Sequence, residues 1–110
     1  MEDFKIIYRI LKAIKHYEMA EIKTLEHFTP DMLKTTKENR DRLILKLIDA
    51  GYVTGFRVVQ KIDGLESPVI LWETSNPSVT IKGLEYLEDN SMMKKVKETL
   101  KGIANVVPKI

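Results

Sequence analysis

The sequence contains no cysteine, which excludes disulfide bonds, zinc sites with thiolate ligands and thiol-based catalysis. It also has no apolar run that approaches the roughly 18 residues a membrane-spanning helix needs. The N-terminal residues include two acids, Glu2 and Asp3, where a signal peptide would carry basic residues. These absences are typical of a cytoplasmic protein, and we expect that location and no membrane partner.

Recognisable catalytic motifs are missing as well. The two histidines, His16 and His27, have no acid, serine or second metal ligand at a characteristic spacing. The five glycines are scattered and form no phosphate-binding loop. The neighbouring carboxylates Glu88 and Asp89 do not face each other on a helix. We therefore predict a protein that binds a partner without catalysis, and we expect no cofactor and no metal.

What the chain does contain is enough apolar sequence for one core. Its 110 residues are 44% apolar, a size that closes one hydrophobic core and is too small for two, so residues 1–110 are predicted to form a single domain. The net charge of +2 is unevenly distributed, because residues 34–46 and 92–110 are basic and residues 47–91 are acidic. Such segregation can steer an anionic partner.

Three helices are predicted in the first half of the chain. Apolar residues at steps of three and four, beginning with Phe4, predict a largely buried helix over about 3–19. Residues 21–25 alternate weakly and are a candidate short strand. Thr29-Pro30-Asp31 is typical of a helix start and predicts a short helix at 30–34. Thr35-Thr36-Lys37-Glu38 resembles a capping box, with Thr35 as the cap and Thr36 as the alternative, and it predicts a third helix over 36–50 that Gly51 ends.

After Gly51 the apolar period changes to two. Residues 52–74 are predicted to form a hairpin with its loop near the Asp63-Gly64 turn, and residues 79–81 are expected to rejoin the sheet. Helices are predicted at 81–90 and 92–106. This order predicts an α+β fold, a winged helix-turn-helix with an additional C-terminal helix, in which the hairpin is the wing.

Three segments carry a family resemblance. The sequence VTIKGLEYLEDNSMMKK at 79–95 resembles the C-terminal signature of the YjcQ family, small proteins of Gram-positive bacteria and their prophages, and DFKIIYRILKA at 3–13 and LIDAGY at 47–52 are similar to that family too. The resemblance is weakest over 66–78. It implies a winged-helix fold and a phage or prophage setting, but no activity and no functional residues. The junction that begins at Thr80 also resembles that of many winged-helix regulators, with Thr80 as a helix cap.

The third helix is the candidate DNA-reading element. In a helix-turn-helix its outward face enters the major groove. That face is predicted to carry side chains that hydrogen-bond bases or phosphates, namely Thr35, Asn39, Arg42 and Lys46. An exposed helix face commonly carries such residues without binding DNA, and Glu38 and Asp49 beside the stripe repel phosphate. Lys37 and Arg40 are expected to form local ion pairs with Asp31 or Asp41 in preference to contacting the DNA backbone.

The predicted wing is a weaker candidate. It contributes Arg57 and Lys61 as phosphate ligands, but it also contains the acidic residues Asp63, Glu66 and Glu73. A dedicated DNA-binding wing would usually be more basic. Two hypotheses therefore remain open: a phage-type DNA-binding or transcription-regulatory protein that uses the third helix, and a winged-helix module that binds another protein and not DNA.

The predicted C-terminal helix carries a heptad seam, formed by Met93, Val96, Leu100, Ile103 and Val107. Two heptads are too few for an autonomous coiled coil. The seam is therefore expected to pack either on the first helix of the same chain or on a second copy, as a homodimer.

Overall fold

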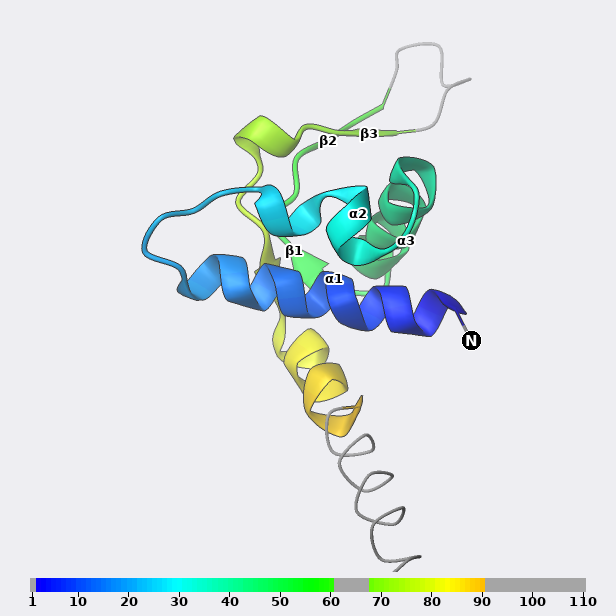
Figure 1. Ribbon diagram of the computed structural model, residues 1–110, viewed down its shortest axis with the longest axis vertical. Helices are drawn as coiled ribbons and strands as arrows, with labels where there is room; N and C mark the ends of the chain where they lie inside the picture. Colours follow the sequence, from blue (N-terminus) through cyan, green and yellow to red (C-terminus); the bar gives the residue numbers. More distant parts are fainter. Residues whose placement is uncertain (1, 61–67, 91–110) are drawn as a thin grey trace, which may run out of the picture.

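The computed structural model describes residues 2–60 and 68–90 (Figure 1). They form a mixed α+β structure in which short helices and two small antiparallel ladders surround one long helix. In chain order the elements are α1 (Glu2–Met19), η1 (Glu26–Phe28), α2 (Pro30–Leu33), α3 (Lys37–Asp49), β1 (Val53–Thr54), β2 (Val58–Val59), β3 (Val69–Ile70), η2 (Trp72–Thr74) and β4 (Ser78–Val79). Residues 81–90 are helical. No helix in the described ranges has the length and hydrophobicity to cross a membrane.

The long helix α1 supplies much of the core. In Figure 1, α2 and α3 lie on one side of α1 and residues 81–90 on the other. Ile10, Leu11 and Ile14 are fully buried, as expected for a helix covered on two sides. Phe4, which was expected in the buried stripe, is instead 55% exposed. Phe4 shares a stripe with the buried Leu11, seven residues later, but it lies in the first turn of α1, near the end of the helix.

The candidate strand at 21–25 is wrong, because this segment forms the connection from α1 to η1. Its backbone has no strand partner there, and its lysine instead caps α1. The Nζ atom of Lys23 donates to the carbonyls of Tyr17, Glu18 and Ala20 at 2.8, 2.9 and 3.3 Å. Carbonyls in the last turn of a helix lack intrahelical partners, so a nearby lysine stabilises them.

The next two helices begin at side-chain caps. Thr29 Oγ1 accepts a hydrogen bond from the amide of Met32 at 3.3 Å, and α2 then begins at Pro30 as predicted. α3 is capped by Thr36, whose Oγ1 accepts from the amide of Asn39 at 3.1 Å. The preferred cap, Thr35, is therefore wrong and its alternative is confirmed. α3 accordingly begins at Lys37, one residue later than predicted.

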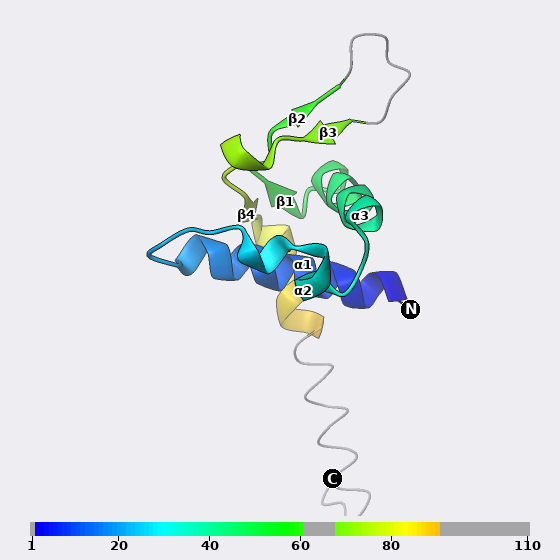
Figure 2. The same cartoon turned by 45° about the horizontal axis from the view of Figure 1, so that its top comes forward.

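The predicted hairpin is confirmed for β2 and β3 but not over the whole of 52–74, because the strand predicted from 52 to 60 is divided between two ladders. β2 pairs with β3, whereas β1 pairs with β4 at the register Val53↔Val79 (Figure 2). The division occurs at Gly55, which has a φ of +85° and whose carbonyl accepts from the amide of Asn76 at 2.9 Å. A backbone turn at that point directs β1 and β2 to different partners.

The predicted cap at Thr80 is confirmed. Thr80 Oγ1 accepts from the amide of Gly83 at 3.1 Å and donates to the carbonyl of Gly51 at 2.6 Å, so one hydroxyl joins the start of the last described helix to the end of α3. The core beneath these elements is formed by apolar side chains from every layer, including Ile10, Ile14, Phe28, Leu33, Ile44, Leu47, Val53, Val79 and Leu87. The predicted helix at 92–106 and its seam of Met93, Val96, Leu100, Ile103 and Val107 lie outside the described residues.

Candidate nucleic-acid interface

The outward face of α3 carries the predicted stripe. Leu43, Ile44 and Leu47 on the inner face are 2%, 0% and 4% exposed, which fixes the rotation of the helix against the core. On the opposite face Arg42 and Lys46 are exposed, and Thr35 and Asn39 at the start of the helix are partly buried. Helix geometry therefore aligns these four residues along one surface stripe.

Three members of the stripe form a hydrogen-bonded chain. Asn39 Nδ2 donates to Thr35 Oγ1 at 3.0 Å, and Arg42 Nε donates to Asn39 Oδ1 at 3.0 Å. These contacts orient the amide of Asn39 and the guanidinium of Arg42. A fixed orientation lowers the conformational entropy that a side chain loses when it binds a partner.

Arg42 also has an acidic partner that the sequence pattern does not reveal. Its Nη2 donates to Asp3 Oδ2 at 3.0 Å, and each side chain is 45% exposed. The hydrogen bond from Arg42, assisted by the charges of Arg42 and Lys46, lowers the pKa of Asp3 below its ordinary value of 3.8, although some desolvation opposes this. The carboxylate thus occupies the position at Arg42 that an external anion would take.

Arg40 does not belong to the exposed stripe. It is 7% exposed, and its Nη1 donates to the carbonyl of Phe28 at 2.8 Å. The expected ion pair with Asp41 is confirmed, with Nε and Oδ1 2.9 Å apart, and the guanidinium lies 4.7 Å from the ring centre of Trp72. Arg40 therefore joins α3 to η1 and η2, whereas Lys37 in the same turn is exposed.

The ladder of β2 and β3 presents apolar side chains to solvent. Arg57 is exposed, and its amide donates to Ser75 Oγ at 2.8 Å. Its neighbours on the ladder are also exposed, with fractions of 38%, 43%, 44% and 37% for Val58, Val59, Val69 and Leu71. Lys61, the other predicted phosphate ligand of the wing, lies outside the described residues, as do Asp63 and Glu66. The described part of the ladder is thus more apolar than basic.

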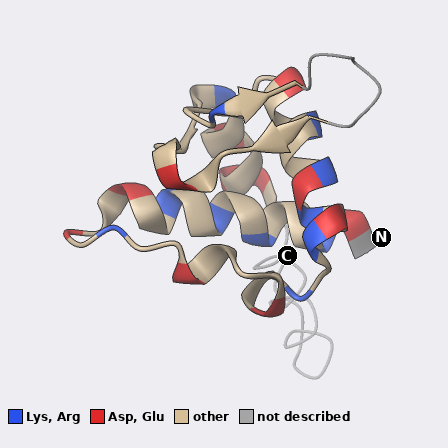
Figure 3. Ribbon diagram, turned by 90° about the horizontal axis from the view of Figure 1, so that it is seen from above, with Lys and Arg blue, Asp and Glu red and all other residues tan. Residues whose placement is uncertain are grey.

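The two histidines lie together, although neither has a partner at a recognisable sequence spacing. Their rings are 4.4 Å apart between centroids in an edge-to-face arrangement, and Glu26 Oε1 is 3.6 Å from His27 Nε2. Within residues 2–60 and 68–90, no three histidine or acidic side chains are grouped so that they could hold a metal ion. Figure 3 shows basic residues recurring along α1, with acidic residues near its two ends.

A comparison with known protein families assigns the chain to one of them. The family model described as YjcQ protein matches residues 8–106, a range that contains almost every described element. The chain therefore belongs to the YjcQ family, as the resemblance of its segments implied. A comparison with curated proteins and a comparison with solved structures each found no match.

Proposed function

We propose that this member of the YjcQ family is a winged helix-turn-helix protein that binds duplex DNA through the outward face of α3 and does not itself catalyse a reaction. The element order supports this proposal. A short helix, a turn and a capped helix precede strand β1. The β2–β3 ladder comes next, then β4, which pairs with β1, and another helix follows. In such folds the second helix of the pair reads the major groove.

The observation that carries the proposal is the composition of the exposed stripe on α3. Asn39 can read an adenine edge and Arg42 a guanine edge, each with two hydrogen bonds. Lys46 follows on the same face one turn later and is exposed, so it can reach a base edge or a phosphate. Thr35, at the start of the stripe, orients Asn39 and can contact the backbone.

The pairing of Arg42 with Asp3 is compatible with this role. The carboxylate of Asp3 and the acceptor atoms of a guanine edge can both accept hydrogen bonds from the guanidinium of Arg42. The pair is partly exposed, so replacement of Asp3 by an acceptor on DNA needs little rearrangement of the core. In the unbound protein, Asp3 would hold Arg42 in an extended position until DNA displaces the carboxylate.

Additional contacts would come from the flanks. Lys37 is exposed in the first turn of α3, and Arg57 is exposed beside the β2–β3 ladder. We include Arg57 and Lys61 as backbone contacts and assign no base reading to them. Binding to a two-fold symmetric site would need a dimer, for which the seam at 93–107 remains the candidate. Regulation of transcription in a phage or prophage is the setting that we propose.

A salt titration with charge-matched variants tests the DNA proposal. Arg42→Gln with Lys46→Gln removes two positive charges from α3, and Lys15→Glu changes the net charge by the same amount at an exposed position on α1. With a random duplex, the double variant should bind more weakly, and its log–log salt slope should fall by about two. Lys15→Glu should keep the wild-type slope.

A second arm uses the acidic partner. Asp3→Asn removes the carboxylate that competes for Arg42, so it should raise DNA affinity by about threefold, in the range of a single exposed charge pair. If wild-type protein does not bind duplex DNA even at low salt, or if the α3 double variant and Lys15→Glu behave alike, the proposal fails.

The second candidate function is a protein-interaction module without DNA binding. The exposed valines of the β2–β3 ladder favour it, because neighbouring exposed apolar side chains are more typical of protein contacts than of phosphate contacts. The two candidates make opposite predictions for a protein with Val59→Thr and Val69→Thr, because these two exposed valines are paired on one face of the ladder. DNA affinity should be unaffected if α3 carries the function, whereas a protein partner would be lost.

A further inference from the structure

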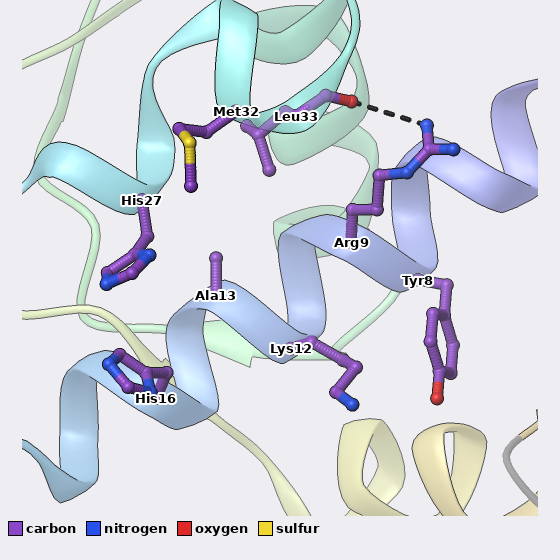
Figure 4. A pocket seen from close by; sticks show the side chains of 8 residues that line it. All are labelled: Tyr8, Arg9, Lys12, Ala13, His16, His27, Met32 and Leu33. Atoms are coloured by element: carbon purple, nitrogen blue, oxygen red, sulfur yellow. Dashed lines mark hydrogen bonds between the residues drawn. The ribbon is translucent and has the colours of Figure 1, made fainter.

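A pocket of about 300 Å³ lies between α1 and the η1–α2 segment (Figure 4). Its volume is at the lower end of the range for small-molecule sites, about 300–1,000 Å³. The residues that line it come from two stretches of sequence, 8–16 on α1 and 27–33 on the opposite side. The pocket is thus separate from the exposed stripe of α3.

The polar lining of this pocket is basic. Arg9, Lys12, His16 and His27 line it, and no lining residue is acidic. One of these residues, His27, has an acidic neighbour, because Glu26 Oε1 lies 3.6 Å from its Nε2 atom. Figure 4 shows the two imidazoles near one end of the pocket, with Arg9 toward the other and Lys12 beside Ala13 on α1.

The apolar part of the lining comes from both sides of the pocket, Ala13 on α1 and Met32 and Leu33 on α2. Ala13 and Leu33 are 8% and 1% exposed, and Met32 is 56% exposed. Tyr8 contributes a ring, over which Lys12 Nζ lies at 5.7 Å from the centroid. The lining is therefore amphipathic, because it combines apolar side chains with side chains that carry nitrogen donors.

The helix pattern explains why three of the donors come from the same face of α1. Arg9, Lys12 and His16 are spaced i, i+3 and i+7, so they share one face of α1. Residues 4–17 contain four Lys or Arg residues and no acid, and like charges on one helix face destabilise a helix unless an anion compensates them. Arg9 Nη1 donates to the Leu33 carbonyl at 3.4 Å, which is long for a hydrogen bond. Because a guanidinium has five N–H donors, this contact leaves Arg9 able to donate to a ligand.

We propose that this pocket binds a small organic anion, a molecule whose carboxylate or phosphate is held by Arg9, Lys12 and His16 and whose apolar body packs on Met32 beside Ala13. Histidine donates a hydrogen bond in either protonation state, so the imidazoles serve as donors without being charged. The inference stands independently of DNA binding by α3.

A phosphate could also come from the backbone of a nucleic acid. The apolar lining favours a small molecule, because the sugars that flank a DNA phosphate are more polar than an aromatic body and are less suited to cover Met32, which is 56% exposed. The two sources are distinguished by measuring binding of small anions and of duplex DNA with the same variants.

The test is a chemical-shift titration of the full chain with matched probes. Phenyl phosphate and benzoate carry an anion on an aromatic body, inorganic phosphate carries the anion alone, and benzyl alcohol carries the body alone. At least one of the two aromatic anions should shift the signals of Ala13, His16, His27 and Leu33 and bind at least several-fold more tightly than either partial probe. Lys12→Gln should weaken that binding about tenfold, whereas Lys15→Gln, on the same helix outside the pocket, should change it less than about twofold.

Three outcomes would overturn the proposal. The first is that neither aromatic anion shifts the pocket signals. The second is that Lys15→Gln weakens binding as much as Lys12→Gln, which would indicate general attraction to a basic helix. The third is that a short duplex displaces the bound anion and Lys12→Gln lowers DNA affinity far more than Lys15→Gln, which would make the pocket a DNA-backbone contact.

Discussion

Arg42 is shared between a neighbour on its own helix and a distant carboxylate. Asn39 lies three residues away on α3 and follows from helix spacing. Asp3 lies 39 residues away, and only the packing of α1 against α3 brings it close. For this reason the sequence predicts the exposed stripe on α3 but does not predict that Asp3 pairs with Arg42 within it.

The pKa of Asp3 reports this contact directly. It is lowered chiefly by the hydrogen bond from Arg42, so Arg42→Gln should raise the pKa toward 3.8. The measurement is an NMR titration of the Asp3 carboxyl carbon, with Lys15→Gln as the control. An unchanged pKa in Arg42→Gln would contradict the pairing.

The direction of the shift also sets its effect on stability. The folded state holds the proton of Asp3 less tightly than the unfolded state does. The contact therefore stabilises the protein fully at pH values above the pKa of the unfolded state, which is about 4. That stabilisation is lost as the pH falls through the lower folded value. The difference in urea midpoint between wild type and Asp3→Asn should therefore be present at neutral pH and should narrow in acid.

Arg40 shows how a charged residue can become part of the core. Its exposed fraction is 7%, and it contacts a carbonyl, a carboxylate and an indole ring. We expect Arg40→Ala to lower the free energy of unfolding by about 3 kcal/mol, from one charged hydrogen bond and one desolvated cation–π contact. Urea unfolding followed by the fluorescence of Trp72, the sole tryptophan, measures the change.

The control for Arg40 is Lys37→Ala in the same turn. Lys37 is exposed, so its truncation should change the free energy of unfolding by no more than about 0.5 kcal/mol. Equal effects of the two substitutions would show that Arg40 contributes only as a solvated charge.

Among the elements, helices were more predictable than strands. Helix ends depend on local caps, so α2 and α3 were predicted to within one residue from Thr29, Thr36 and Gly51. Strand pairing depends on segments distant in sequence. β1 and β4 are separated by the entire β2–β3 ladder, and the alternation of residues 52–60 carries no sign that the strand changes partner at Gly55.

Two glycines allow the turn at Gly55 to be tested against a matched reference. Gly51 and Gly55 have φ values of +82° and +85°, but a Cβ at Gly51 would meet nothing within 4 Å, whereas one at Gly55 would lie 2.1 Å from the carbonyl oxygen of Asn76. Gly51→Ala should cost about 1–2 kcal/mol for its backbone conformation alone. Gly55→Ala should cost about 3 kcal/mol or more, because the contact between the ladders must also open.

Chemical denaturation of both variants measures the difference. If Gly55→Ala is no more destabilising than Gly51→Ala, the close approach of the Gly55 and Asn76 backbones does not hold the two ladders together. A larger loss of unfolding free energy for Gly55→Ala would support a turn at Gly55 that sends β1 and β2 to different partner strands.

At the scale of the whole molecule, two candidate binding faces are joined through the turn between α2 and α3. Arg9 reaches from the pocket to the carbonyl of Leu33, and Thr35 begins the α3 stripe two residues later. The turn has hydrogen bonds of its own, however. The amides of Leu33, Lys34 and Thr35 donate to Thr29, Asp31 and Pro30 at 3.1, 3.2 and 3.0 Å, all shorter than the 3.4 Å contact from Arg9.

The turn should therefore keep its shape when an anion draws Arg9 away from Leu33, and the two faces should bind independently. Saturating phenyl phosphate should change DNA affinity by less than about twofold, well below the roughly 5–150-fold effects typical of allosteric coupling. Because coupling of binding free energies is reciprocal, saturating duplex should leave phenyl phosphate affinity equally unchanged. Fluorescence anisotropy of a labelled duplex, repeated with Lys12→Gln to exclude simple competition for charge, measures this coupling. A change of fivefold or more that Lys12→Gln abolishes would show that the Arg9 contact, despite its length, controls the position of α3.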